Sequence, residues 1–195
     1  MLLQKIPLFR QGSYPVFCRI MLSLREFQKR QTGISYLMMY KKFESGGKIE
    51  IIDGYRKKAD HRDLVSIARF FAKQGGNVKI TTDIHFKDAK YREVFGGLIN
   101  TKYERKCPDL IIDGKFYEYE NYKPPFKKEK ISNMLSQGIK QSSRIIINNN
   151  KGTTHRIIRR NIYNRVVFEK QNIDEVWLYE KGEIIQLYKK TKGNN

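Results

Sequence analysis

A short stretch of this basic chain carries several carboxylates, at Glu104, Asp109, Asp113, Glu118 and Glu120. Elsewhere positive charge dominates, since the 195 residues contain 39 Lys and Arg against 20 Asp and Glu, a formal net charge of +19. Residues 1–43 hold eight basic side chains and one acid, and residues 121–165 hold eleven and one. Basic surfaces bind phosphates, and clustered carboxylates bind divalent cations. We therefore expect a cation site between two phosphate-binding blocks.

Three of these carboxylates come together if the intervening residues fold as a hairpin. The Asp113-Gly114 pair lies between two runs rich in β-formers and predicts a two-residue turn. That turn places Asp109 opposite Glu118, and strand alternation places Glu120 on the same face. Like charges opposed on a sheet are destabilising, so a bound cation would explain them, and oxygen ligands favour Mg²⁺ or Mn²⁺. The alternative is a solvated hairpin edge whose acids pair with nearby lysines.

The elements that must hold this hairpin predict an α/β fold, a mixed β-sheet flanked by helices. A helix is expected at residues 61–73, with Asp60 as its N-cap and Asp63 in its first turn. Further helices are expected at residues 21–31, 129–141 and from 153 or 154 to 167. Besides the hairpin, strands are expected at 48–52, 77–82, 144–147, 176–179 and 184–188. Residues 85–106 are expected to form a loop with one turn of helix.

The length suits one domain with an extension. We expect an N-terminal arm at 1–55, an α/β domain at 56–190 and a polar tail at 191–195. No apolar run approaches the ~20 residues of a membrane span, and Lys5 and Arg10 interrupt the N-terminus, so no membrane span or secretory signal is expected. Cys18 and Cys107 are too few for a disulfide scaffold. A cytoplasmic protein is expected, and a toxin delivered into a target cell's cytoplasm would have the same composition.

The hairpin residues also resemble a known signature. Pro108-Asp109, with Glu118-Tyr119-Glu120 beginning nine positions after Asp109, resembles the motif of PD-(D/E)XK nucleases. It is most similar to the branch found in C-terminal toxin domains of CdiA-type contact-dependent inhibition proteins. The resemblance covers residues 60–150, in which helix, strand, hairpin, helix and strand follow in the family's order. It implies a restriction-endonuclease-like core and metal-dependent hydrolysis of phosphodiesters.

The resemblance assigns roles to the acids. Asp109 and Glu118 would bind the metal that positions and deprotonates a water molecule. Asp63 would add the further acid that this fold often supplies from the preceding helix, or would only stabilise the helix dipole.

One position departs from the family. Its motif ends in a lysine that stabilises the phosphate transition state, whereas this chain has Glu120 there. One interpretation is that Glu120 is a further catalytic ligand or base and that Lys123 supplies the positive charge, with Lys115 as another candidate. The other interpretation is that the site is inactive.

Candidate nucleic-acid contacts follow the hairpin. Arginines beside an apolar helix stripe suit phosphate contacts and base stacking. They are Arg156, Arg159, Arg160 and Arg165. Gln137 and Gln141 lie four apart on one expected helix face, where the family can use a glutamine to orient substrate, or they form a polar surface. His155 is a phosphate ligand, a general acid or a structural histidine, and Trp177 is expected in the core.

The sequence therefore predicts a metal-dependent endonuclease with Mg²⁺ or Mn²⁺ as cofactor and nucleic acid as partner. The toxin branch favours RNA, and specifically tRNA, over DNA, and it implies an immunity protein as a further partner. The alternatives are an inactive nuclease-like protein that binds nucleic acid, and a DNA nuclease of a mobile element. A basic protein of ribosomes or membrane surfaces is a third reading, to which the carboxylates give no support.

Overall fold

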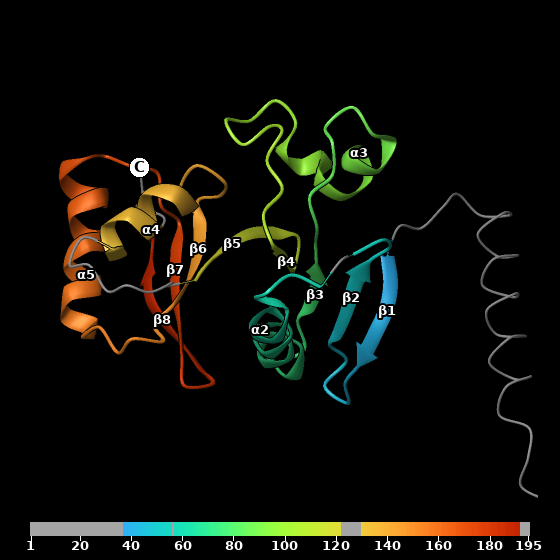
Figure 1. Cartoon of the computed structure of the whole chain (residues 1–195), viewed down its shortest axis with the longest axis horizontal. Helices are drawn as coiled ribbons and strands as arrows, with labels where there is room; N and C mark the ends of the chain where they lie inside the picture. Colours follow the sequence, from blue (N-terminus) through green and yellow to red (C-terminus); the bar gives the residue numbers. More distant parts are fainter. Residues whose placement is uncertain (1–36, 56, 122–129, 192–195) are drawn as a thin grey trace, which may run out of the picture. The chain divides into compact units, whose positions relative to one another are not determined.

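An eight-stranded mixed sheet organises the residues that the structure, a computed structural model, describes: 37–55, 57–121 and 130–191 (Figure 1). The strands lie in the sheet in chain order. They are β1 (Leu37–Lys42), β2 (Lys48–Ile52), β3 (Asn77–Ile80), β4 (Leu110–Ile112), β5 (Lys115–Asn121), β6 (Arg144–Asn148), β7 (Glu175–Glu180) and β8 (Glu183–Lys189). The pairs β2–β3, β5–β6 and β6–β7 are parallel, and the other four are antiparallel. The α/β class with a mixed sheet is as predicted.

Four α-helices accompany these strands within the described residues. They are α2 (His61–Lys73), α3 (Ala89–Phe95), α4 (Lys130–Gly138) and α5 (His155–Tyr163). A 3-10 turn, Gly96–Leu98, follows α3, and a π-helical turn, Asn164–Phe168, follows α5. The order around the hairpin is therefore α2, β3, β4, β5, α4 and β6, with α3 inserted before β4.

Most predicted boundaries are close to those observed, and two elements are shorter. β2 and α2 have the predicted bounds, whereas β3 ends at Ile80. α4 ends at Gly138 rather than near residue 141, and after it the N–H groups of Lys140 and Gln141 bond carbonyls three residues back, as in a turn, rather than four. The helix predicted at residues 21–31 lies outside the described residues. β1 and β2 pair with the rest of the sheet, which thus includes residues 37–52 of the predicted N-terminal arm.

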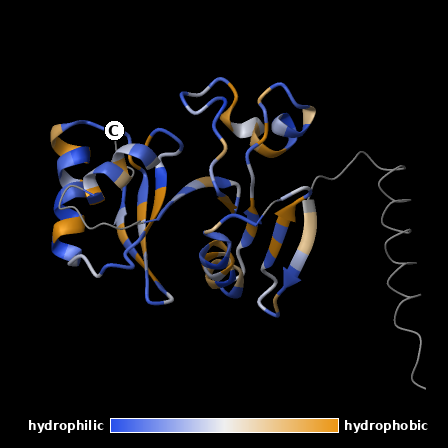
Figure 2. Ribbon diagram, in the orientation of Figure 1, coloured by the Kyte–Doolittle hydropathy of each residue, from blue (hydrophilic) through white to orange (hydrophobic). Residues whose placement is uncertain are grey.

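The two faces of the sheet are covered by different helices. On one face, α2 packs Leu64, Ile67 and Ala68 into a cluster with side chains from β2 to β6, and Trp177 packs against it. On the other face, α3 forms a cluster with Ile111, while α4 and α5 form another with β6, β7 and β8. In Figure 2, hydrophobic and hydrophilic bands alternate along α5, as expected for a helix with one buried face. The end of β5 near Glu118 and Glu120 lies between the two clusters on this second face.

Candidate functional site

The β4–β5 hairpin has the register that the sequence predicts. Leu110 pairs with Tyr117, Ile111 with Phe116 and Ile112 with Lys115. The turn residues Asp113 and Gly114 have positive φ angles of 48° and 76°, as a two-residue type I′ turn requires. This register places Asp109 opposite Glu118 at the open end of the hairpin.

The three carboxylates share one face of the sheet. Leu110, Tyr117 and Tyr119 belong to the cluster under α2, so Asp109, Glu118 and Glu120 point to the opposite face. Glu118 and Glu120 of β5 lie beside Ile145 and Ile147 of the neighbouring strand β6. These two isoleucines belong to the cluster beneath α4 and α5. The carboxylates therefore lie between that cluster and the α3 cluster. Asp109, Glu118 and Glu120 therefore lie on one face of the sheet, as the predicted register requires.

Their environment disfavours the ionised state. Burial, together with the charges of Asp109 and Glu120, raises the pKa of Glu118 to about 9. Burial and the charge of Asp109 raise the pKa of Glu120 to about 7. Burial also raises the pKa of Asp109 above its ordinary value, against the opposing effect of Lys58. The Oε2 atom of Glu118 is buried and has no hydrogen-bond partner among the residues that the structure describes. Buried polar atoms are almost always hydrogen-bonded, so this oxygen is an exception within the described structure.

Lys58 forms an ion pair with Asp109. This contact was not predicted from the sequence. Its Nζ atom lies 3.5 Å from Oδ1 of Asp109 and 3.6 Å from Oδ2 of Asp83. Burial acts to lower the pKa of Lys58, but these two carboxylates raise it above its ordinary value. Asp109 also accepts a hydrogen bond from the N–H of Tyr119 at 3.3 Å. Lys58 thus partly neutralises the carboxylates from a segment 51 residues upstream.

The donor set fits a hard divalent cation, although it is not preassembled. Among the described residues, no three His, Cys, Asp or Glu side chains form a group that could hold a metal ion. The carboxylates offer only oxygen ligands, and Glu118 contributes an unsatisfied one. Oxygen ligands of this kind suit Mg²⁺ and Mn²⁺.

The comparisons give no identity. No protein-family model, curated protein or solved structure matches this chain. In the described part of the chain, no helix is long and apolar enough to span a membrane. The geometry of the site therefore carries the functional argument.

Asp63 is not brought together with the other acids. It lies on α2, across the sheet, and its Oδ2 accepts hydrogen bonds from the hydroxyl of Tyr119 at 2.7 Å and from Nδ2 of Asn148 at 3.0 Å. Burial and the hydrogen bond to Asp63 raise the pKa of Tyr119. Asp63 thus anchors α2 to β5 and β6. Its predicted role as a metal ligand has no support in this arrangement, because the sheet separates it from Glu118.

The other residues predicted to lie near the carboxylates have different positions. Gln137 is exposed and lines a pocket of about 300 Å³ together with Glu120. Gln141 follows the end of α4, so the two glutamines do not share a helix face as predicted. Lys115 lies 3.9 Å from Oε1 of Glu175, and Lys123 lies outside the described residues.

α4 passes close to the carboxylates at Gly138. A Cβ atom at this position would lie 3.0 Å from Cγ2 of Ile145 and 3.3 Å from Cγ of Glu120. The absence of a side chain therefore allows α4 to pack directly on β5 and β6. This contact holds the stem of Glu120 against the sheet.

The predicted nucleic-acid-binding arginines divide into two pairs. Arg156, Arg159 and Arg160 are all exposed on α5. Arg159 donates to the carbonyl of Leu187 at 2.9 Å, and Arg165 donates to Glu169 and to Ser132. The second pair thus has internal partners that stabilise the fold.

His155 forms a separate contact at the start of α5. Its Nε2 lies 2.9 Å from Oε2 of Glu180, and Glu180 also accepts a hydrogen bond from Asn149. This contact joins α5 to β7, which agrees with the structural interpretation of His155.

Proposed function

We propose that this protein is a metal-dependent nuclease that hydrolyses phosphodiester bonds of nucleic acid. The observation that carries the proposal is the placement of Asp109, Glu118 and Glu120 on one face, with a buried unsatisfied oxygen at Glu118. A surrounding basic chain with a net charge of +19 would attract a polyanionic substrate. The order α2, β3, β4, β5, α4 and β6 is also that implied by the resemblance to PD-(D/E)XK nucleases.

Each residue has a role in this proposal. Asp109 and Glu118 would hold Mg²⁺ or Mn²⁺, and the bound ion would act as a Lewis acid and lower the pKa of a water molecule. Glu120 lies on the same face and is either a further oxygen ligand or the group that accepts a proton from that water. Lys58 supplies positive charge beside Asp109, from a segment outside the motif. Asp63 acts only by positioning α2 against β5.

The proposed substrate is RNA, with tRNA favoured by the resemblance to toxin domains. That resemblance also suggests action in the cytoplasm of a target cell and an immunity protein that blocks the site. A DNA nuclease of a mobile element is the alternative within the same chemistry.

The test is a cleavage assay with purified protein on tRNA and on duplex and single-stranded DNA. We expect cleavage of tRNA with Mg²⁺ or Mn²⁺, and none after chelation with EDTA. Restoration of activity by added Mg²⁺ would separate chelation from denaturation. Cleavage that continues at full rate in EDTA would overturn the metal mechanism.

A second candidate function is favoured by Glu120, which replaces the family's lysine. The protein would then bind nucleic acid through its basic surface without cleaving it. Binding in a filter or gel-shift assay, combined with no cleavage under Mg²⁺, Mn²⁺, Ca²⁺ or Zn²⁺, would establish this function instead.

The exposed arginines of α5 give a prediction that both functions share. Replacing Arg156 and Arg160 by glutamine is expected to weaken RNA binding and to reduce the slope of log K against log salt by about 1.4, because each lost phosphate contact to a single strand removes about 0.7. The measurement is fluorescence anisotropy with labelled RNA over a range of salt concentrations.

The matched control makes the same charge change on α2, across the sheet. Arg62 and Arg69 are also exposed, and replacing both by glutamine is expected to change the slope much less. Equal slopes for the two double variants would show that the arginines of α5 contribute no more to RNA binding than those of α2.

A further inference from the structure

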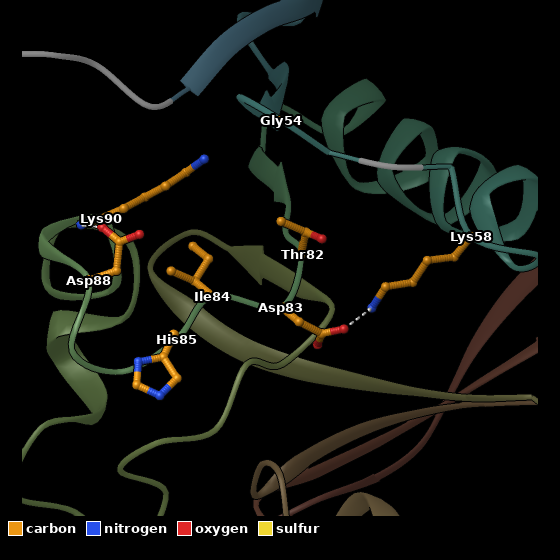
Figure 3. Close-up of a pocket in the computed structure, with 8 residues that line it drawn as sticks. All are labelled: Gly54, Lys58, Thr82, Asp83, Ile84, His85, Asp88 and Lys90. Atoms are coloured by element: carbon orange, nitrogen blue, oxygen red, sulfur yellow. Dashed lines mark hydrogen bonds and ion pairs between the residues drawn. The ribbon is translucent and has the colours of Figure 1, made fainter.

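A surface pocket of about 520 Å³ opens beside Lys58 (Figure 3). Most of its lining comes from the segment that leaves β3, including Thr82, Asp83, Ile84 and His85. Asp88 closes one side, where its Oδ1 accepts a hydrogen bond from the N–H of Lys90 at 2.9 Å and so caps α3. The volume lies in the range of pockets that bind small molecules or single bases.

The pocket is joined to the carboxylate site by short contacts. Thr81, which precedes the pocket residue Thr82, donates its N–H to the carbonyl of Asp109 at 3.0 Å and its hydroxyl to the carbonyl of Pro108. Lys58 both lines the pocket and lies 3.5 Å from Oδ1 of Asp109. A group bound in the pocket could therefore contact Lys58, which itself contacts Asp109.

The lining differs in charge from the rest of this cationic protein. It contains two carboxylates, Asp83 and Asp88, beside two ammonium groups, Lys58 and Lys90. These charges cancel, so the pocket is not a simple phosphate site. Asp83 and Asp88 are both exposed, so their oxygens can accept hydrogen bonds from a ligand.

Two further side chains suit a flat aromatic ligand. His85 is exposed, with its ring centroid 4.9 Å from that of Phe86, and Ile84 offers apolar contact within the pocket. Proteins bind unpaired bases by stacking on such rings and by hydrogen bonds to the base edges.

Guanine fits this combination of groups. Its N1–H and N2–H₂ donors lie side by side and match the two oxygens of one carboxylate, while O6 and N7 accept hydrogen bonds from ammonium groups. No other common base offers two adjacent donors together with two adjacent acceptors. A pocket with both carboxylates and ammonium groups therefore favours guanine.

We propose that this pocket binds a guanine base, with Asp88 accepting hydrogen bonds from its N1–H and N2–H₂ groups. The identity of the ligand as part of a nucleic-acid substrate rests on the proposed nuclease function. In that setting, the pocket makes the enzyme cleave beside an unpaired guanosine, because Lys58 joins the pocket to Asp109.

The first test uses mononucleotides and the full chain in EDTA, so that it needs no catalysis. Guanosine 5′-monophosphate is compared with the adenosine, cytidine and uridine monophosphates by calorimetry. We expect the guanosine nucleotide to bind at least about tenfold more tightly, as one bidentate base contact allows. Equal affinities for the four nucleotides would overturn the proposal.

The second test replaces Asp88 by asparagine, which can still cap α3 through its side-chain oxygen. The Asp88→Asn variant is expected to lose the guanosine preference, because its amide puts a donor where an acceptor is needed. The matched control is Asp113→Asn, an exposed carboxylate in the hairpin turn outside the pocket, and it should bind as the wild type does. Unchanged guanosine binding by Asp88→Asn would also overturn the proposal.

Sequencing of cleavage products separates this proposal from the nuclease assignment. Cleavage next to guanosine that becomes indiscriminate in Asp88→Asn supports both. Cleavage with no base preference in the wild type would support the nuclease function and contradict the guanine pocket. Guanosine binding that depends on Asp88, in a protein that cleaves no nucleic acid, would support the guanine pocket and contradict the nuclease function.

Discussion

Replacing Asp109 by asparagine is expected to lower the rate of RNA cleavage by about 10²–10³-fold, the loss typical of removing one group that stabilises transition-state charge. Asparagine keeps an oxygen that can accept the hydrogen bond from the N–H of Tyr119, so the hairpin should remain folded. It removes the charge that would hold the divalent ion beside Glu118. The measurement is single-turnover cleavage at saturating Mg²⁺, with circular dichroism to verify the fold.

The same hairpin supplies a matched control. Asp113→Asn makes the identical chemical change four residues along, in the turn, where asparagine also tolerates a positive φ. Its oxygen can still accept the hydrogen bond from the N–H of Asn77. We expect near wild-type cleavage. Metal-dependent cleavage that survives Asp109→Asn would remove the carboxylates from the mechanism.

Replacing Glu118 by glutamine is expected to stabilise the metal-free protein at high pH. The carboxyl has a pKa of about 9 in the folded chain against an ordinary value of 4.5. Below pH 4.5 it is protonated in both the folded and unfolded states, so it contributes no pH dependence there. Between 4.5 and 9 the unfolded chain ionises first, so the free energy of unfolding falls as pH rises. Glutamine cannot ionise, so the free energy of unfolding of the Glu118→Gln variant should not fall in this way as the pH rises.

At pH 8 the loss avoided is at most about 5 kcal/mol, about 1.4 kcal/mol for each of the 3.5 pH units between 4.5 and 8, so the unfolding midpoint should rise by several degrees or more. At pH 5 the variant and the wild type should have nearly equal midpoints. The measurement is thermal unfolding in EDTA from pH 5 to pH 8. Glu93→Gln, an exposed site on α3, is the control and should follow the wild type.

A divalent ion provides the complementary measurement. Mg²⁺ should raise the midpoint of the wild type at pH 8 by mass action, and much less so that of Glu118→Gln. A variant that parallels the wild type at every pH, with or without Mg²⁺, would contradict the assignment of Glu118 as a destabilising buried carboxylate.

The hairpin could be predicted from sequence because its information is local. An Asp-Gly turn fixes which residues face one another, and strand alternation then fixes which side chains share a face. Asp109, Glu118 and Glu120 followed from those two rules alone. β2 and α2 have their predicted bounds for the same reason, because turn or cap residues next to each element mark where it begins and ends.

Lys58 and Asp63 could not be placed from the sequence, because their positions depend on how α2 packs. The apolar stripe of α2 predicts that the helix covers a sheet, but it does not indicate which face. α2 covers the face opposite the carboxylates, which directs Asp63 to Tyr119 and Asn148. The loop before α2 reaches the edge of the other face and brings Lys58 to Asp109. Nothing distinguishes Lys58 in the sequence from the other basic residues.

The separation of Lys58 from Asp109 along the chain also bears on the order of folding. A hairpin closed by a two-residue turn can form in about 1–10 μs, whereas contacts between distant segments form later because they must close a long loop. Lys58 and Asp109 are 51 residues apart. We therefore expect the hairpin to bring its carboxylates together before Lys58 docks, at a stage when water still hydrates them and burial has not yet penalised their charge.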